Sequence, residues 1–283
     1  MNTAFYVFMK LLPKNAASRA FGALTRLRIP FISAKARDLF CSYYKLNMDE
    51  AEYPLEHYAN IGELFIRHLK PGARPIADTE IVSPVDGVLS QTAVFDDKPT
   101  LIQAKGKTYT LKSLLRDAEL AKKFEGGAFA TIYLAPFNYH RIHCPAKAEV
   151  IGASYCPGTL WPVNVGSVER VEGLFSINER LTSHLRLEDG SEMLVVKVGA
   201  TNVGRIGVSY SKNLLVNAGK LPRNKKRHDW TPKKKIEIEK GGELGRFEMG
   251  STVILVVDKK IRERNPELFK NRVGQAVKVG EAL

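Results

Sequence analysis

Four residues stand in sequence contexts that suit nucleophilic and acid–base chemistry. Asp86 lies in a Ser-Pro-Val-Asp-Gly sequence, and His140 and His143 stand three residues apart in a segment flanked by prolines. Ser251 follows Gly250 directly before an apolar run. A serine hydroxyl becomes a nucleophile when a histidine takes its proton and a carboxylate orients that histidine. These residue types predict nucleophilic chemistry, provided that the fold brings them together.

The Gly250–Ser251 bond is itself suited to attack by the serine hydroxyl. Glycine has no Cβ to block approach to its carbonyl, and its backbone tolerates strained dihedral angles. Ordinary structural roles compete with this chemistry, because an aspartate between proline and glycine commonly forms a turn and histidines commonly occupy loops. Two histidines without a second ligand pair at the usual spacing do not predict a metal site.

The elements that must position these residues follow one another as helices first and strands later. Helical spacing of apolar residues predicts helices over 59–69, ended by Pro71-Gly72, and over 111–124. Runs rich in β-branched residues predict strands over 129–134, 149–155, 193–198, 205–210, 235–238 and 252–257. This order predicts an α+β fold, with N-terminal amphipathic helices and a largely antiparallel, β-sandwich-like catalytic domain.

Length and composition exclude several classes of protein. The chain has 283 residues, of which 44% are hydrophobic and 26% charged, so it is neither wholly disordered nor fibrous. No apolar run approaches the roughly 20 residues of a membrane-spanning helix. The three cysteines are an odd number and widely spaced, which favours a reducing compartment over a disulfide scaffold.

The net charge of +13 comes from two segments, 1–46 and 220–235, which carry +7 each, so that the rest of the chain is close to neutral at −1. The first segment mixes its bases with apolar side chains, as in helices that lie on an anionic membrane. Pro13 and Pro30 should break it into short helices. A solvated basic face or a cleaved transit peptide would also explain the first segment. The second segment has one tryptophan and no further aromatic side chain, so nucleic acid is not a predicted partner.

Six motifs, in order along nearly the whole chain, resemble those of the bacterial-type, pyruvoyl-dependent phosphatidylserine decarboxylases. They are Phe-Ile-Arg-His-Leu-Lys-Pro-Gly-Ala-Arg-Pro-Ile at 65–76, Ser-Pro-Val-Asp-Gly at 83–87, Tyr-His-Arg-Ile-His at 139–143, Gly-Leu-Phe-Ser-Ile-Asn-Glu-Arg at 173–180, Val-Gly-Ala-Thr-Asn-Val-Gly at 198–204 and Gly-Ser-Thr at 250–252. Met249 and Asn138 depart from the family pattern, which has leucine and aspartate there. Asn138 cannot carry a charge, so no acid–base role is expected for it.

The resemblance implies that the chain cuts itself between Gly250 and Ser251. In that scheme Asp86 orients His143, His143 deprotonates Ser251, and the serine oxygen attacks the Gly250 carbonyl to convert the amide into an ester. Elimination then releases the Gly250 carboxylate and leaves a dehydroalanine at position 251. This residue tautomerises and is hydrolysed by water to a pyruvoyl group, with loss of ammonia. The products, residues 1–250 and 251–283, should stay associated, and neither a metal nor pyridoxal phosphate is needed.

The resemblance also implies the reaction and its setting. The amine of phosphatidylserine forms a Schiff base with the pyruvoyl group, carbon dioxide leaves, His140 reprotonates the carbon, and phosphatidylethanolamine is released. We expect residues 1–58 to be a helical membrane-association segment and residues 59–283 the catalytic domain. By analogy the protein is a homodimer, bound peripherally to an anionic phospholipid membrane at the cytoplasmic face of the bacterial cell membrane.

Three other functions are compatible with parts of the sequence. A pyruvoyl decarboxylase of a soluble amino acid would not need the basic amphipathic N-terminus. A Ser-His-Asp hydrolase expects its serine in a Gly-x-Ser-x-Gly elbow, whereas Ser251 opens a strand-like run. A non-catalytic membrane-binding module would explain the charge but none of the motifs.

Overall fold

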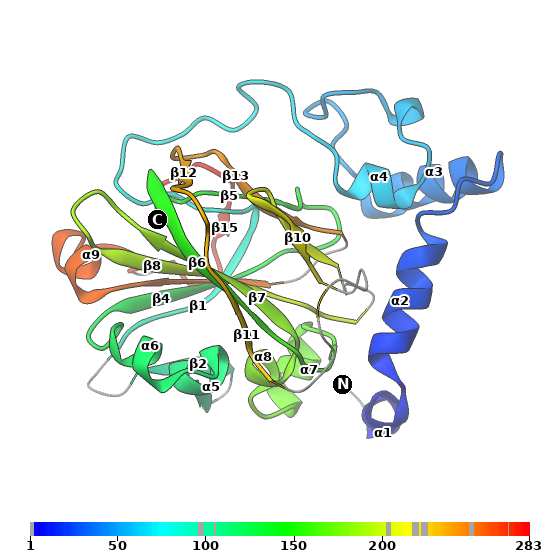
Figure 1. Cartoon of the computed structure of the whole chain (residues 1–283). Helices are drawn as coiled ribbons and strands as arrows, with labels where there is room; N and C mark the ends of the chain where they lie inside the picture. The colour runs from blue at the N-terminus through cyan, green and yellow to red at the C-terminus, as the bar shows by residue number, and fades with distance from the viewer. Residues whose placement is uncertain are drawn as a thin grey trace.

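The computed structural model describes residues 3–95, 99–104, 106–201, 205–216, 221, 226–248, 252–270 and 272–283. The predicted cleavage residues Gly250 and Ser251 lie outside these ranges, as does Met249. In the described chain, N-terminal helices precede two antiparallel sheets that pack against each other (Figure 1). This arrangement confirms the predicted α+β class.

Short helices form the N-terminal region. They are α1 (Thr3–Leu11), α2 (Lys14–Leu24), α3 (Ile32–Tyr44), the 3-10 turn η1 (Leu55–His57) and α4 (Ile61–Phe65). Pro13 separates α1 from α2 and Pro30 separates α2 from α3, as predicted. The rings of Tyr6 and Trp161 stack with their centroids 5.6 Å apart, and the Asn15 side-chain amide donates to the Gly158 carbonyl at 2.9 Å. The first two helices therefore pack against the β-rich part of the chain, beside which α2 stands in Figure 1.

Among the described residues, nine strands form the larger sheet and four form the smaller one. The larger sheet has the order β11-β6-β7-β8-β14-β4-β1-β15, with β12 also paired to β6, and the smaller has the order β10-β9-β13-β5. The strands of the larger sheet are β1 (Gly87–Val94), β4 (Ala128–Tyr133), β6 (Ala148–Cys156), β7 (Arg180–Arg186), β8 (Glu192–Val198), β11 (His228–Trp230), β12 (Glu237–Ile238), β14 (Thr252–Val257) and β15 (Ala276–Val277). Those of the smaller sheet are β5 (Arg141–His143), β9 (Ile206–Val208), β10 (Ser211–Leu215) and β13 (Glu243–Phe247), while β2 (Thr100–Ala104) and β3 (Lys107–Thr110) form a separate hairpin.

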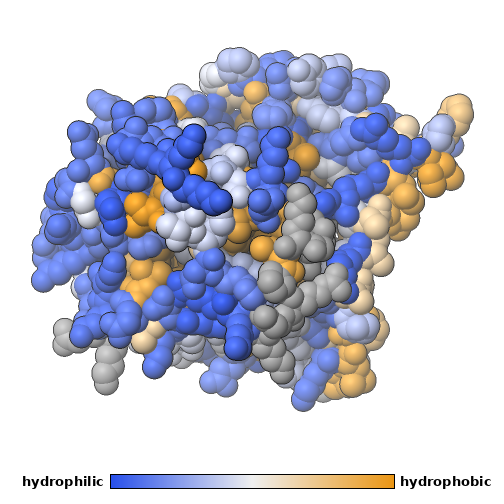
Figure 2. Space-filling view, viewed as in Figure 1, coloured by the Kyte–Doolittle hydropathy of each residue, from blue (hydrophilic) through white to orange (hydrophobic). Residues whose placement is uncertain are grey.

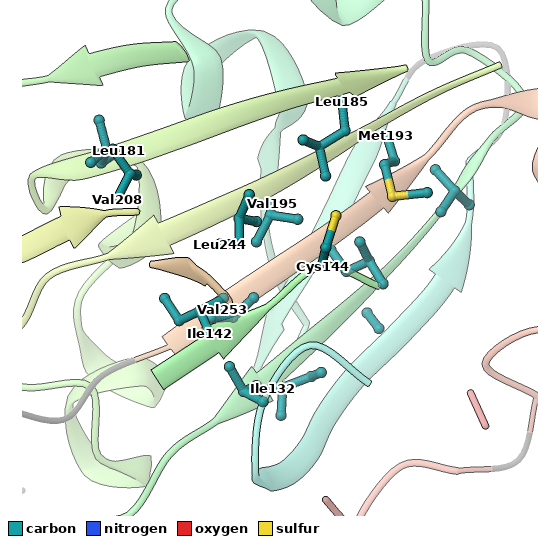
Figure 3. Packing of buried hydrophobic residues seen from close by; sticks show 14 of the residues in the cluster. Ile132, Ile142, Cys144, Leu181, Leu185, Met193, Val195, Val208, Leu244 and Val253 are labelled. Atoms are coloured by element: carbon teal, nitrogen blue, oxygen red, sulfur yellow. The ribbon is translucent and has the colours of Figure 1, made fainter. Parts of the chain in front are cut away.

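Strand β14, predicted over the same residues, is buried on both faces and pairs along its whole length with β4 and β8. Val253 and Leu255 point into the core between the two sheets, which Figure 3 shows from close by. Ile254 and Val256 point to the opposite face, which packs against the β2–β3 hairpin and the short helices. These helices are α5 (Leu111–Leu115), α6 (Ala118–Lys122), α7 (Val165–Arg170) and α8 (Leu174–Ile177), and α9 (Lys259–Arg264) follows β14.

Two helix predictions were wrong in extent. The helix predicted over 111–124 is broken into α5 and α6, because Arg116 adopts a left-handed conformation and the Asp117 side chain accepts from the Leu120 amide at 2.9 Å, which starts a new helix. The helix predicted over 59–69 is only α4, after which the Leu69 backbone bridges to Ala51. In both places a local polar contact or a tertiary contact overrides apolar periodicity.

Leu255→Ala should lower the free energy of unfolding by about 2–5 kcal/mol, because it opens a cavity in a fully buried strand. Urea unfolding of an uncut Ser251→Ala chain measures the effect. Val273→Ala is the control, since Val273 belongs to the same C-terminal segment and is 53% exposed. Equal losses in the two variants would contradict the central position of β14.

Candidate active site

One end of the larger sheet gathers the sequence motifs. Arg180, Val198, Thr252, Tyr133 and Val88 face one another in a continuous row across β7, β8, β14, β4 and β1. Arg180, Val198 and Thr252 lie in motifs that the sequence singled out, Val88 directly follows one, and Tyr133 ends the strand that leads to the two histidines. Segments far apart in the chain therefore meet at one edge of one sheet, which is the arrangement that a composite site requires.

The predicted cleavage segment connects the two sheets at this edge. Glu248 follows β13 in the smaller sheet, and Thr252 begins β14 in the larger one. The connection between β4 and β5 also leads from the larger sheet to the smaller one. It is bonded to both sides of the cleavage segment: the Phe247 amide donates to the His140 carbonyl at 3.0 Å, and Thr252 lies opposite Tyr133. The described residues on both sides of Gly250 and Ser251 are thus bonded to the segment that contains the two histidines.

His140 is fully buried at this crossing. Its Nδ1 lies 2.8 Å from the Asn138 carbonyl, which requires Nδ1 to donate, and its Nε2 has no partner among the residues that the structure describes. Burial, together with the charge of Arg67, lowers the pKa of His140 to about 3. The ring is therefore neutral, and Nε2 presents a free lone pair. In this state His140 can accept a proton, so the donor role predicted for it requires that Nε2 be protonated first.

His143 lies further along β5, opposite Glu243. Its Nδ1 donates to the Gly241 carbonyl at 2.7 Å, and its Nε2 accepts from the Tyr139 hydroxyl at 3.2 Å. Burial lowers the pKa of His143, although the Gly241 carbonyl and the charges of Glu243 and Asp86 oppose that shift. The His143 ring is thus held in one orientation by a backbone carbonyl.

Asp86 is brought to the same corner, but its carboxylate binds other groups. Arg74 contacts both oxygens, with Nε 3.0 Å from Oδ1 and Nη2 2.6 Å from Oδ2, and the Val279 amide donates to Oδ1 at 2.9 Å. Within the described residues no hydrogen bond joins Asp86 to His143, so the predicted orienting contact is made by Gly241 instead. Asp86 acts on His143 through its charge and through the turn, because the His143 amide donates to the Pro84 carbonyl at 2.8 Å.

The C-terminal segment holds the Asp86 turn in place. The Ser83 amide donates to the Glu281 carbonyl at 2.7 Å, the Gly280 amide donates back to the Ser83 carbonyl at 3.0 Å, and β15 pairs with the start of β1. These contacts lie on the C-terminal side of the predicted cut. The segment that follows the cut therefore supplies one wall of the site.

Sequence patterns did not identify Arg74, Tyr139 or the Gly241 carbonyl as parts of this corner. Arg74 and Tyr139 do stand within quoted motifs, so their position was the available signal. Gly241 contributes its backbone carbonyl, and because every residue has one, the residue type gives no signal of this role. Asn138, where the family pattern has aspartate, accepts from the Ala135 amide at 2.8 Å and stabilises a turn.

The two basic segments that the sequence singled out, 1–46 and 220–235, lie partly within the described residues. Large exposed apolar side chains recur along the first three helices and the connection between α2 and α3: Phe5, Val7, Phe8, Leu11, Leu24, Leu27, Ile29, Phe31, Ile32, Leu39 and Tyr43. The right edge of Figure 2, where α1 and α2 lie, is largely orange. The basic segment 220–235 falls partly outside the described residues, whereas Lys233, Lys234 and Lys235 lie on the described surface. No helix in the described part of the chain has the length and apolarity needed to cross a bilayer.

Comparison with known proteins identifies close relatives over the full chain. A model of the family named phosphatidylserine decarboxylase matches residues 61–283. The phosphatidylserine decarboxylase proenzyme of Anaeromyxobacter sp. (strain K) is 46% identical, covering 100% of this chain and 99% of its own length. The proenzymes of Myxococcus xanthus and Brevibacillus brevis are 45% and 41% identical, covering 90% and 96% of this chain and 90% and 94% of their own lengths.

The neutral state of His140 has a consequence for stability. Because its pKa of about 3 lies below the value of about 6.5 in an unfolded chain, the unfolded state binds more protons between these values. The contribution of His140 to stability is complete above about pH 6.5 and decreases as the pH falls toward about 3.

His140→Gln should therefore flatten the decline in the free energy of unfolding by up to about 1.4 kcal/mol per pH unit between about pH 6 and pH 4. Urea unfolding of the uncut chain at several pH values measures the slope. His57→Gln, at an exposed position, is the control. An unchanged slope in His140→Gln would show that His140 is protonated in the folded chain.

Proposed function

Because the chain belongs to the phosphatidylserine decarboxylase family, we propose that it converts phosphatidylserine into phosphatidylethanolamine after cutting itself between Gly250 and Ser251. The observation that carries the proposal is the convergence of the motif-bearing strands at the edge where β14 begins. A pyruvoyl group made from Ser251 would supply a ketone that binds the substrate amine and accepts the electrons released with carbon dioxide.

The described residues that flank the predicted cut fit such a group. His140 is fully buried, its Nε2 has no partner within the described ranges, and its carbonyl accepts from the Phe247 amide shortly before the cut. The Phe65 ring covers the His140 ring, with centroids 3.9 Å apart, and Phe40 of α3 lies against Phe65 with centroids 6.2 Å apart. A chain of aromatic rings thus connects the N-terminal helices to the site and excludes water from it.

The two histidines take different parts in this proposal. His143, oriented by the Gly241 carbonyl and biased by the charge of Asp86, takes the proton of Ser251 once Tyr139 has released its Nε2. His140 acts in the decarboxylation, where it returns a proton to the substrate carbon. Arg74 and the Val279 amide keep Asp86 in position beside them.

The setting of the reaction is also part of the proposal. The exposed apolar side chains of α1 to α3 and the bases among them would place the protein on the cytoplasmic face of the bacterial cell membrane, where its lipid substrate lies. Residues 1–58 would be the membrane-association segment and residues 59–283 the catalytic domain. A homodimer, expected from the resemblance, stays a prediction.

The intact mass of freshly purified protein tests the self-cleavage. We expect two chains, 1–250 and 251–283, with the second lighter by one ammonia than a chain that starts with serine. Ser251→Ala should give a single uncut chain without activity. An uncut wild-type chain that is nevertheless active would overturn the proposal.

Variants of the two histidines separate their roles in the same assay. His143→Ala should remain uncut, whereas His140→Gln should be cut and yet release carbon dioxide at least about 100-fold more slowly, as is typical when a general acid or base is removed. If His140→Gln remained uncut while His143→Ala was cut, the roles of the two histidines would be reversed.

Leu11→Ser combined with Phe31→Ser tests the membrane role, because these side chains are 79% and 82% exposed. Each loss should weaken binding to anionic vesicles by roughly 10-fold or more, since burying such a side chain contributes about 1.5–3 kcal/mol. Sedimentation with vesicles measures binding. Turnover of a soluble short-chain phosphatidylserine should be unchanged, and Val273→Ser is the matched control. Equal losses on vesicles and on the soluble lipid would contradict the membrane role.

A further inference from the structure

Three arginines surround one glutamate directly before the cleavage segment. The Glu248 carboxylate forms ion pairs with all three: its oxygens lie 3.0 Å from Arg205 Nη1, 3.5 Å from Arg246 Nη2 and 3.7 Å from Arg26 Nη1. The Glu248 amide also donates to the Arg205 carbonyl at 2.9 Å, which fixes the backbone. The arginines come from the turn after α2, the start of β9 and β13, so the fold assembles this arginine cluster from distant segments.

The arginine cluster has more positive charge and more donors than Glu248 can satisfy. One carboxylate faces three guanidinium groups, which leaves a net charge of about +2 at a partly buried position. The Nε atoms of Arg205 and Arg246 are buried, and neither has a hydrogen-bond partner among the described residues. Burial, and then the charge of Arg205, lower the pKa of Arg26. The repulsion among these like charges is relieved when an anion binds to the guanidinium groups.

The arginine cluster adjoins the exposed apolar residues of the N-terminal region. Arg26 lies in the turn after α2, between Leu24 and Leu27, which are both exposed. Its side chain runs beside Gly62, where an added Cβ would come within 2.8 Å of the Arg26 Cγ, so a glycine is needed to let it reach Glu248.

The sequence places the arginine cluster close to the predicted cut. Glu248 stands three residues before Ser251, and each residue spans at most about 3.6 Å, so the two residues lie within about 11 Å of each other in the uncut chain. An anion bound at the cluster would therefore lie near the position of the pyruvoyl group. In phosphatidylserine only the serine carbon chain separates the phosphate from the amine that must reach that position.

We propose that Arg26, Arg205 and Arg246 bind the phosphate of the lipid substrate, while Glu248 holds the three guanidinium groups in place when no substrate is bound. The inference rests on the proposed function and adds the residues that recognise its substrate. Guanidinium groups suit this task because their planar donors bind phosphate oxygens in pairs. The bound phosphate would set the depth at which the serine amine meets the reactive centre.

A purely structural ion cluster makes the opposite prediction for one variant. If the cluster only stabilises the fold, Glu248→Gln should impair the enzyme as much as loss of an arginine does. If the cluster binds phosphate, Glu248→Gln frees all three guanidinium groups and should leave the KM for the lipid unchanged or lower. The sign of the Glu248→Gln effect therefore separates the two roles.

The test compares two soluble substrates in processed enzyme, with rates normalised to the amount of cut C-terminal chain measured by mass. One substrate is a short-chain phosphatidylserine below its micelle concentration, and the other is an O-alkyl serine, which keeps the amine and the carboxylate but has no phosphate. Arg205→Gln should raise the KM for the lipid about 10- to 100-fold, the range typical of a charged hydrogen bond, with little change in kcat. Its KM for the O-alkyl serine should be unchanged.

Arg264→Gln is the matched control, because Arg264 pairs with Glu80 and Asp189 away from the motifs and should leave both KM values unchanged. If Arg205→Gln is not processed, Arg26→Gln and Glu248→Gln decide the question by the same comparison. An unchanged lipid KM in the arginine variants, or a raised one in Glu248→Gln, would overturn the inference. A wild-type enzyme that is neither cut nor active would instead overturn the proposed function.

Discussion

The rest of the molecule depends on the burial of β14 between β4 and β8. Every side chain of this strand is buried, and its two faces complete two different hydrophobic clusters. Burial of each large apolar side chain contributes about 1.5–3 kcal/mol, so the strand is among the most strongly held parts of the chain. Because Thr252, the first residue of β14, directly follows Ser251 in the chain, a strongly held strand begins one residue after the predicted reactive residue.

The stability of β14 offsets the cost of unfavourable polar and charged groups around its first residue. Around the start of β14 lie a buried histidine whose Nε2 has no partner in the described part of the chain, a carboxylate bound by an arginine, and three arginines that share one glutamate. Each of these arrangements costs stability when considered alone. Together they are typical of a site whose polar groups are completed by a reacting chain or by a ligand.

Sequence patterns predicted the fold class and the strand over 252–257 because unbroken apolar and β-branched residues leave few alternatives. They failed at Asp117, where a single capping side chain interrupts an otherwise helical pattern. The residue types of the site were recognisable, whereas the partners of those residues were not. Arg74 reaches Asp86 from 12 positions away, and Gly241 orients His143 through a backbone atom, so neither contact leaves a signal in local spacing.

The route of the chain through the two sheets makes folding and processing an ordered sequence. Strand β14 finds its place between β4 and β8 while it is still tethered to β13, so that loop closure within one chain brings the reactive bond into position. Once the bond is cut, that tether is gone, and reassembly after denaturation would need two separate molecules to meet. Refolding of the mature enzyme would then depend on the concentration of its two chains, whereas refolding of the uncut chain would not. The cut therefore converts a reversibly folded precursor into a product whose persistence depends on how slowly it comes apart.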